Sequence, residues 1–373
     1  MAAAATAQVL STPKKSGVEL KKYDYVQLYV GNAYQSMQFL RTVWGFVPVA
    51  YAGLETGVRN HISYVLAQGN VRLVVTSPLD PSSRMAHDVR LHGDAVREIA
   101  FTVRDSAEVF NAALLRGACP IAEPATTEDE FGQLTQATIS SPSHVIHTFI
   151  ERNDYHGVFR PGYQALPVSD EAQPACLTEL DHVALSLPAG QLDQATEYYT
   201  NILDLEVKHE ENIVTPRSAM NSKVVENSSS TVRFPMMEPG EGKHKSQIEE
   251  YLKYNQGPGV QHLAFSCTDI IDSARRLNHN GAQFLATPKT YYDLLPNRVG
   301  GLDEEIAILR DLNILADRDE WGYLLQIFSK PVTGRPTLFL ELIQRHGARG
   351  FGSGNIRALF DAVEREQALR GNL

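Results

Sequence analysis

The chain lacks the features that mark several large classes of protein. Its 373 residues include only three cysteines, none of them in a Cys-x-x-Cys pair, so we expect neither a disulfide framework nor a zinc cluster. No apolar run reaches the length of about 20 residues that crosses a membrane. The net charge of −10 lacks the positive excess with which proteins bind nucleic acids or anionic membranes. We therefore expect a globular protein that binds neither nucleic acid nor membrane.

The N-terminal segment, MAAAATAQVLSTPKKSG, does not resemble an export signal. It has no basic stretch ahead of an apolar core. Residues 1–20 are therefore interpreted as a disordered lead-in, and the protein is predicted to be cytoplasmic. With 373 residues the chain is too long for one compact core, which favours two domains.

The most informative feature is an internal repeat. The segment VREIAFTVRDSAEVFNAALLRGACPIAEP, from Val96, aligns with VQHLAFSCTDIIDSARRLNHNGAQFLATP, from Val260. Both segments predict a strand, a helix, a Gly-Ala turn and a second strand that ends at proline. Asp105 and Asp269 suit the N-caps of the two helices, and the turn glycines suit left-handed C-terminal positions.

A second pair of segments aligns in the same way. DYVQLYVGNAYQSMQFLRTVWGFVPV, from Asp24, matches DHVALSLPAGQLDQATEYYTNILDLEV, from Asp181. Together with the hairpin strands that follow, these segments define four βαβββ modules. We predict an α+β fold of two open, barrel-like domains, residues 21–157 and 179–373, joined by a linker at 158–178.

The repeat singles out two histidines and a glutamate in the second half. His182, His262 and Glu341 lie at equivalent places in apolar strands, spaced 80 and 79 residues apart. The aligned residues of the first half are Tyr25, Glu98 and Thr148. Because a role required by the fold would appear in both halves, this asymmetry favours a functional site. Two imidazoles and a carboxylate on three strands suit non-haem Fe(II), although zinc accepts the same ligands and a metal-free buried His–Glu network is the third alternative.

Several motifs then indicate a family. KSQIEEYL, GVQHLAF, YYDLL, LADRDEWGYLLQIF and RPTLFLELIQRHGARGFGSGNI resemble the 4-hydroxyphenylpyruvate dioxygenases and 4-hydroxymandelate synthases, of the vicinal-oxygen-chelate superfamily. The resemblance extends from about Tyr23 to Leu373. It implies a glyoxalase-like fold, Fe(II) held by the two histidines and the glutamate, and a homo-oligomer. It also implies O2 and a 2-oxo acid that binds the iron directly, so that no 2-oxoglutarate is needed.

The same resemblance implies roles for further residues. Ser222, Gln247 and Gln326 would serve catalysis, Gln261 would orient the substrate, and Phe328, Phe339 and Phe351 would hold its ring. The amphipathic helix from Asn355 to about Ala368 would be a lid over the pocket.

Two positions bear on the product. Met237 stands in FPMMEP where the dioxygenases normally have asparagine, and Ile356 ends GFGSGNI where they normally have phenylalanine. Both changes are toward the synthase, which hydroxylates the benzylic carbon and yields 4-hydroxymandelate, a precursor for peptide antibiotics. Either residue could instead simply fill the core. The alternatives are a dioxygenase that yields homogentisate, a metal-free binding protein and an extradiol ring-cleaving enzyme.

Overall fold

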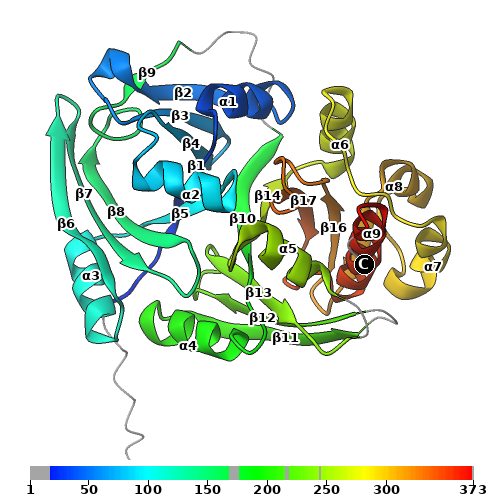
Figure 1. Cartoon of the computed structure of the whole chain (residues 1–373). Helices are drawn as coiled ribbons and strands as arrows, with labels where there is room; N and C mark the ends of the chain where they lie inside the picture. The colour runs from blue at the N-terminus through cyan, green and yellow to red at the C-terminus, as the bar shows by residue number, and fades with distance from the viewer. Residues whose placement is uncertain (1–16, 168–175, 215–217, 243–244, 372–373) are drawn as a thin grey trace, which may run out of the picture.

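The computed structural model describes residues 17–167, 176–214, 218–242 and 245–371. Most of the expected lead-in, residues 1–16, lies outside them. The chain forms two curled sheets (Figure 1), one from each half of the sequence. Among the described residues, no helix has both the length and the apolar character needed to cross a membrane.

The first sheet has nine strands. From edge to edge they are β6 (Pro120–Asp129), β7 (Gly132–Ser140), β8 (Ile146–Tyr155), β5 (Ala95–Thr102), β1 (Lys22–Tyr29), β4 (Val71–Pro78), β3 (His61–Gln68), β2 (Val47–Ala52) and β9 (Gln164–Ala165).

The second sheet has eight strands in the same spatial order, apart from the added β9. They are β11 (Glu206–Val214), β12 (Ala219–Glu226), β13 (Arg233–Pro239), β10 (Leu177–Ser186), β14 (Gly259–Cys267), β17 (Phe339–His346), β16 (Tyr323–Phe328) and β15 (Leu315–Arg318). The predicted fold of two open, barrel-like sheets is therefore confirmed.

Helices lie between the strands, and one follows the last strand (Figure 1). They are α1 (Ala33–Thr42), α2 (Arg84–His92), α3 (Ser106–Leu115), α4 (Leu192–Ile202), α5 (Gln247–Asn255), α6 (Ile270–His279), α7 (Lys289–Val299), α8 (Ile306–Leu312) and α9 (Ser353–Leu369). The predicted caps are present, because the carboxylates of Asp105 and Asp269 accept hydrogen bonds from backbone amides at the starts of α3 and α6. Gly117 and Gly281 both have a φ of 98°, a left-handed conformation that glycine adopts without strain.

One predicted strand is wrong. The repeat placed a strand directly after Gly281, but there Phe284 forms only an isolated bridge with Ser329. Pro288 is the N-cap of α7, whereas its repeat equivalent Pro124 lies inside β6. The helices α7 and α8 are thus inserted before β15, which occupies the sheet position that β6 has in the first half.

The predicted linker, residues 158–178, is partly structured. Phe159 is buried inside the first sheet, where its ring lies 5.1 Å from that of Tyr25. Residues 164–165 form β9, and β10 begins at Leu177. Residues 168–175 lie outside the described part of the chain, and the domain boundaries stay a prediction.

A continuous apolar core joins the two halves. It includes the outer face of each sheet and the helices that cover it, with Val26 and Phe101 from the first half and Val183 and Phe265 from the second. Buried polar contacts also cross the boundary, such as the 3.0 Å hydrogen bond between Nε2 of His147 and the hydroxyl of Tyr199. The inner, concave face of each sheet carries a smaller and separate set of side chains.

Candidate metal centre

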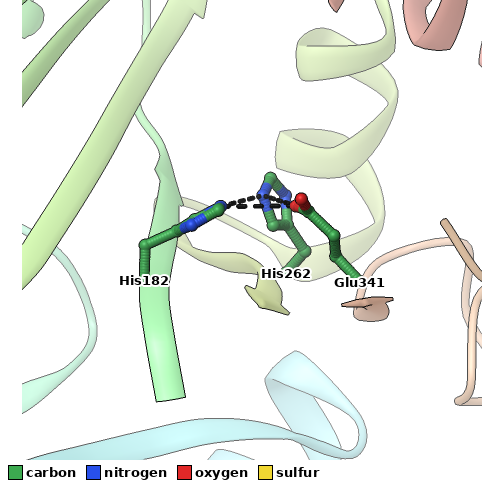
Figure 2. A group of neighbouring side chains, drawn as sticks. All are labelled: His182, His262 and Glu341. Carbon is green, nitrogen blue, oxygen red and sulfur yellow. Dashed lines mark hydrogen bonds and ion pairs between the residues drawn. The ribbon is translucent and has the colours of Figure 1, made fainter. Parts of the chain in front are cut away.

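Strand register brings the two histidines and the glutamate together. Ala264, on β14, is the pairing partner of both His182 on β10 and Glu341 on β17. His262 lies two residues before Ala264 and therefore points to the same face of the sheet. Figure 2 shows the three side chains converging from their strands on one point.

The ligand atoms lie at distances that suit one ion. The Oε2 atom of Glu341 is 3.3 Å from Nε2 of His182 and 3.4 Å from Nε2 of His262. The two Nε2 atoms are 3.4 Å apart. Metal–nitrogen bonds of about 2.1 Å place neighbouring ligands about 3 Å apart. All three side chains are buried. A donor set of two imidazoles and one carboxylate fits a transition metal with open positions.

Charge and burial act differently on the two imidazoles. Burial, followed by the adjacent charge of His182, lowers the pKa of His262 well below its ordinary value. For His182 burial also favours the neutral ring, but the carboxylates of Glu341 and Asp181 outweigh it and raise the pKa. Without a metal, His182 is therefore the ring that binds a proton more readily, and a bound metal would displace that proton.

Each of the three side chains has a polar partner on the side away from the common point. Nδ1 of His182 lies 2.8 Å from Oδ1 of Asp181, and Nδ1 of His262 lies 3.2 Å from Oε1 of Gln261. The amide of Gln326 donates a 2.9 Å hydrogen bond to Oε1 of Glu341. These partners leave both Nε2 atoms and Oε2 of Glu341 available to a metal.

A register shift brings the side chain of Gln261 to the imidazole of His262. Strict alternation puts it on the opposite face from His262, yet its side chain reaches that ring. The reason is a shift of register between Ala184 and Leu185, which leaves Gln261 without a pairing partner on β10.

Gln326 links the centre to the C-terminal helix. Its Oε1 accepts a 2.9 Å hydrogen bond from Asn355, at the start of α9. Asn355 in turn accepts a 2.6 Å hydrogen bond from the hydroxyl of Tyr291, on α7. Gly352 has a φ of 74°, and a Cβ there would collide with Oε1 of Gln326. The start of α9 is therefore shaped to fit the side chain of Gln326.

Three phenylalanines surround the imidazoles. The ring of Phe339 stacks on His262 with centroids 4.8 Å apart, and Phe328 lies edge-on to the same ring at 6.4 Å. Phe351 lies edge-on to His182 at 5.3 Å. The three residues predicted to hold a substrate ring thus line the centre.

Met237 and Ile356 belong to an apolar cluster on the same concave face, together with Ala184, Met220 and Ile248. Ala184 lies two residues from His182 along β10, so this cluster adjoins the centre. This cluster is an apolar wall beside the metal centre, and it includes both positions that the sequence singled out, Met237 and Ile356.

The predicted polar residues Ser222 and Gln247 lie beside this cluster. Ser222 is the pairing partner of Met237, and its hydroxyl donates a 3.2 Å hydrogen bond to the carbonyl of Glu211. The buried Oε1 of Gln247 has no hydrogen-bond partner within the described residues, and neither has the hydroxyl of Ser186, the other pairing partner of Met237. No hydrogen bond joins Ser222 or Gln247 to the three ligand candidates in the described part of the chain.

Sequence reasoning missed Asp181, Ser186 and Asn355. Asp181 carried a usable signal, because it precedes His182 and matches Asp24 in the repeat. Burial by itself would favour its neutral acid, yet the charge and hydrogen bonds of Arg345 hold the pKa of Asp181 well below its usual value. Ser186 and Asn355 carried no distinguishing pattern.

The chain is similar to known proteins in both sequence and structure. The family model described as Glyoxalase/Bleomycin resistance protein/Dioxygenase superfamily matches residues 179–327. The chain is 40% identical to a 4-hydroxyphenylpyruvate dioxygenase of Yarrowia lipolytica, over 94% of this chain and 93% of that protein. It is 38% identical to a 4-hydroxyphenylpyruvate dioxygenase of Dictyostelium discoideum, over 95% and 100%. The solved structure of a triple mutant of 4-hydroxymandelate synthase from Streptomyces coelicolor matches with a TM-score of 0.85 and 39% identity, over 94% and 99%.

Proposed function

Since the chain belongs to the 4-hydroxyphenylpyruvate dioxygenase family, we propose that it is an Fe(II)-dependent dioxygenase that acts on a 2-oxo acid. The proposed reaction converts 4-hydroxyphenylpyruvate and O2 to 4-hydroxymandelate and CO2. The observation that carries the metal assignment is the convergence of His182, His262 and Glu341 within 4.8 Å of one another.

In this proposal the three residues would hold Fe(II), and a set of three protein ligands leaves room for further ligands. The bound iron supplies the activation of O2 that oxidative decarboxylation of the 2-oxo acid needs. The protein's part is to fix the ligands, through Asp181, Gln261 and Gln326, and to exclude water. The buried rings around the imidazoles and the α9 lid serve the second purpose.

The substrate ring would lie on the concave face of the second sheet. Phe328, Phe339 and Phe351 offer aromatic faces and edges to it. The buried, unpartnered Oε1 of Gln247 can accept a hydrogen bond from the phenol hydroxyl, which would satisfy both groups. Ser222 and Gln261 remain proposed as further polar contacts.

The choice of 4-hydroxymandelate rests on the apolar wall formed by Met237 and Ile356. Neither side chain can donate a hydrogen bond to the substrate. We infer that the ring would then lie farther from the metal centre and that the benzylic carbon would face it instead. A displacement of about 1 Å is enough to redirect such a reaction.

Homogentisate is the second candidate product. It is favoured by the relatives that are 38 to 40% identical over nearly the whole chain and carry the name 4-hydroxyphenylpyruvate dioxygenase. The two products are isomers, so oxygen uptake and CO2 release do not distinguish them.

The deciding experiment is product analysis. The protein is incubated with Fe(II), ascorbate and 4-hydroxyphenylpyruvate, and the products are separated by chromatography against both standards. We expect 4-hydroxymandelate; homogentisate as the main product would overturn the first assignment and support the second. Two further measurements test whether the protein is instead a zinc protein or a metal-free binding protein. They are metal analysis after anaerobic reconstitution with Fe(II), and O2 uptake by the reconstituted protein. Neither of these alternatives would consume O2. A homo-oligomer, a cytoplasmic location and a use of the product in antibiotic biosynthesis stay predictions.

A further inference from the structure

A buried carboxylate lies directly behind one of the proposed metal ligands. Asp181 contacts Nδ1 of His182 at 2.8 Å through Oδ1. Arg345 donates to both carboxylate oxygens, at 2.8 and 2.9 Å, and Arg233 donates to Oδ2 at 3.0 Å. The Asp181 side chain is 3% exposed. The hydroxyl of Ser266 also donates to Oδ2, at 3.4 Å. The hydrogen-bonding capacity of the carboxylate is therefore taken up by two cations, one imidazole and one hydroxyl.

Arg345 also reaches the loop that leads to α9. Its Nη1 donates to the carbonyls of Ala348, at 3.3 Å, and Gly350, at 2.6 Å. The guanidinium lies 5.4 Å from the ring centroid of Phe351, the residue whose ring lies edge-on to His182. The guanidinium of Arg345 thus holds the carboxylate of Asp181, which contacts the His182 imidazole. It also holds the loop that carries Phe351, whose ring contacts the same imidazole.

The first half of the chain contains the matching ion pair without the imidazole. Asp24, the repeat equivalent of Asp181, receives hydrogen bonds of 2.8 and 2.7 Å from Arg152, and Arg72 lies at 3.3 Å. The residue after Asp24 is Tyr25, whose hydroxyl donates at 2.7 Å to Glu98. The aspartate–arginine pair is therefore part of the fold in both halves, while in the described residues the contact with an imidazole occurs in the second half.

An imidazole whose Nδ1–H is held by a carboxylate has one tautomer and one ring orientation, with the Nε2 lone pair directed at the metal. We propose that Asp181 is a positioning residue for His182 and that Arg345 holds Asp181 in place. This inference rests on the proposed metal centre. The carboxylate would keep the ring oriented before the metal binds, so its loss would weaken metal binding beyond any effect on folding.

The test compares Asp181→Asn with the matched control Asp24→Asn in the full-length, metal-free protein. An amide cannot accept hydrogen bonds at both of its ends, so either the arginines or the imidazole of His182 lose a partner in Asp181→Asn. Binding of Co(II) is followed anaerobically by its visible absorption, and thermal unfolding is measured on the same samples. We expect Asp181→Asn to bind Co(II) about 10- to 100-fold more weakly than the wild type. Asp24→Asn should bind as the wild type does, even if both variants unfold at lower temperature.

Arg345→Lys serves as a second variant in case Asp181→Asn does not fold. Lysine keeps the charge but cannot form the bidentate pair, so we expect weaker Co(II) binding and an altered Co(II) spectrum. Equal affinity of Asp181→Asn and Asp24→Asn, or of Arg345→Lys and the wild type, would overturn the inference and leave the proposed function intact. If the wild type itself bound no Co(II), the proposed metal centre would fall, and this inference with it.

Discussion

Asn355, at the start of α9, donates a 2.9 Å hydrogen bond to Gln326, whose amide nitrogen holds the carboxylate of Glu341 at 2.9 Å. The two contacts connect the C-terminal helix to a proposed metal ligand through a single buried side chain. Tyr291 and Arg298 hold the other end of Asn355, at 2.6 and 3.1 Å. Docking of α9 and orientation of Glu341 are thus parts of one hydrogen-bond network.

This network predicts the effect of Asn355→Ala. The substitution leaves the buried Oε1 of Gln326 without its hydrogen-bond donor, which costs about 1 to 3 kcal/mol, whereas Tyr291 keeps its hydrogen bonds with Ala316. We expect turnover of 4-hydroxyphenylpyruvate to fall about 10-fold or more as Glu341 loses its fixed orientation. Arg357, exposed on the same helix, provides the control: Arg357→Ala should retain wild-type turnover. A similar loss in both variants would show that α9 as a whole, and not this contact, matters.

The ligand assignment predicts that Glu341→Gln abolishes iron binding. The amide matches the shape of the carboxylate but removes the negative charge that binds the metal. Because even outer partners of ligands contribute 10- to 100-fold in affinity, we expect a loss of at least about 100-fold. Bound iron is measured by elemental analysis after anaerobic reconstitution and desalting.

The repeat supplies the control for this experiment. Thr148 is the equivalent of Glu341 in the first half, since it pairs with Ala100 as Glu341 pairs with Ala264. Thr148→Ser should leave the iron content unchanged. Retention of iron by Glu341→Gln would exclude the glutamate as a ligand.

The product assignment predicts the outcome of the double substitution Met237→Asn with Ile356→Phe. The asparagine adds a hydrogen-bonding group and the phenylalanine adds an aromatic face to the wall of the pocket. We expect the ratio of homogentisate and other ring-hydroxylated products to 4-hydroxymandelate to rise at least several-fold. The ratio is read by chromatography, with Met220→Leu, in the same apolar cluster, as the control. An unchanged ratio would show that Met237 and Ile356 do not determine the product.

The burial of His147 predicts part of the dependence of the free energy of unfolding on pH. Its side chain is fully buried, and this burial lowers its pKa to about 3. In the unfolded chain the residue binds a proton below its ordinary pKa of about 6.5, whereas in the folded chain it does not. Its contribution to stability is therefore complete above pH 6.5 and is lost as the pH falls from 6.5 toward 3, by about 1.4 kcal/mol for each pH unit.

The measurement compares wild type with His147→Gln by urea unfolding at pH 7, 6 and 5. Glutamine can keep the hydrogen bond to Tyr199 but does not titrate. We expect the variant to be less stable at pH 7 and the difference between the two proteins to shrink as the pH falls. His279→Gln, at an exposed position, is the control. A difference that stays constant with pH would contradict this account of His147.

Most of the fold could be read from the sequence because its signals are local. Strand alternation, the N-cap aspartates and the turn glycines depend on neighbouring residues, and the repeat showed each of them twice. The strand expected after Gly281 is absent, for a reason that the local sequence pattern does not reveal. The aligned segments are similar and both reach a proline, but Pro124 lies inside β6 whereas Pro288 is the N-cap of α7. The chain then inserts two helices before it returns to the sheet.

Some features of the metal centre could likewise be predicted from the sequence, and others could not. His182, His262 and Glu341 were predicted because the repeat compared them with Tyr25, Glu98 and Thr148. The contact of Gln261 with His262 was not, because it depends on the register shift against β10. The link between Asp181 and Arg345 joins residues 164 positions apart, and no local pattern connects them.

The sequence by itself determined which side chains were available and on which faces of which strands most of them would lie, since alternation and repetition are properties of the chain. Only the tertiary structure decided that β10, β14 and β17 lie side by side in a register that brings three of those side chains to one point. It also decided which buried partners hold them there. Register and partners are set by hydrogen bonds and packing between segments about 80 and 160 residues apart, where local preferences have no influence.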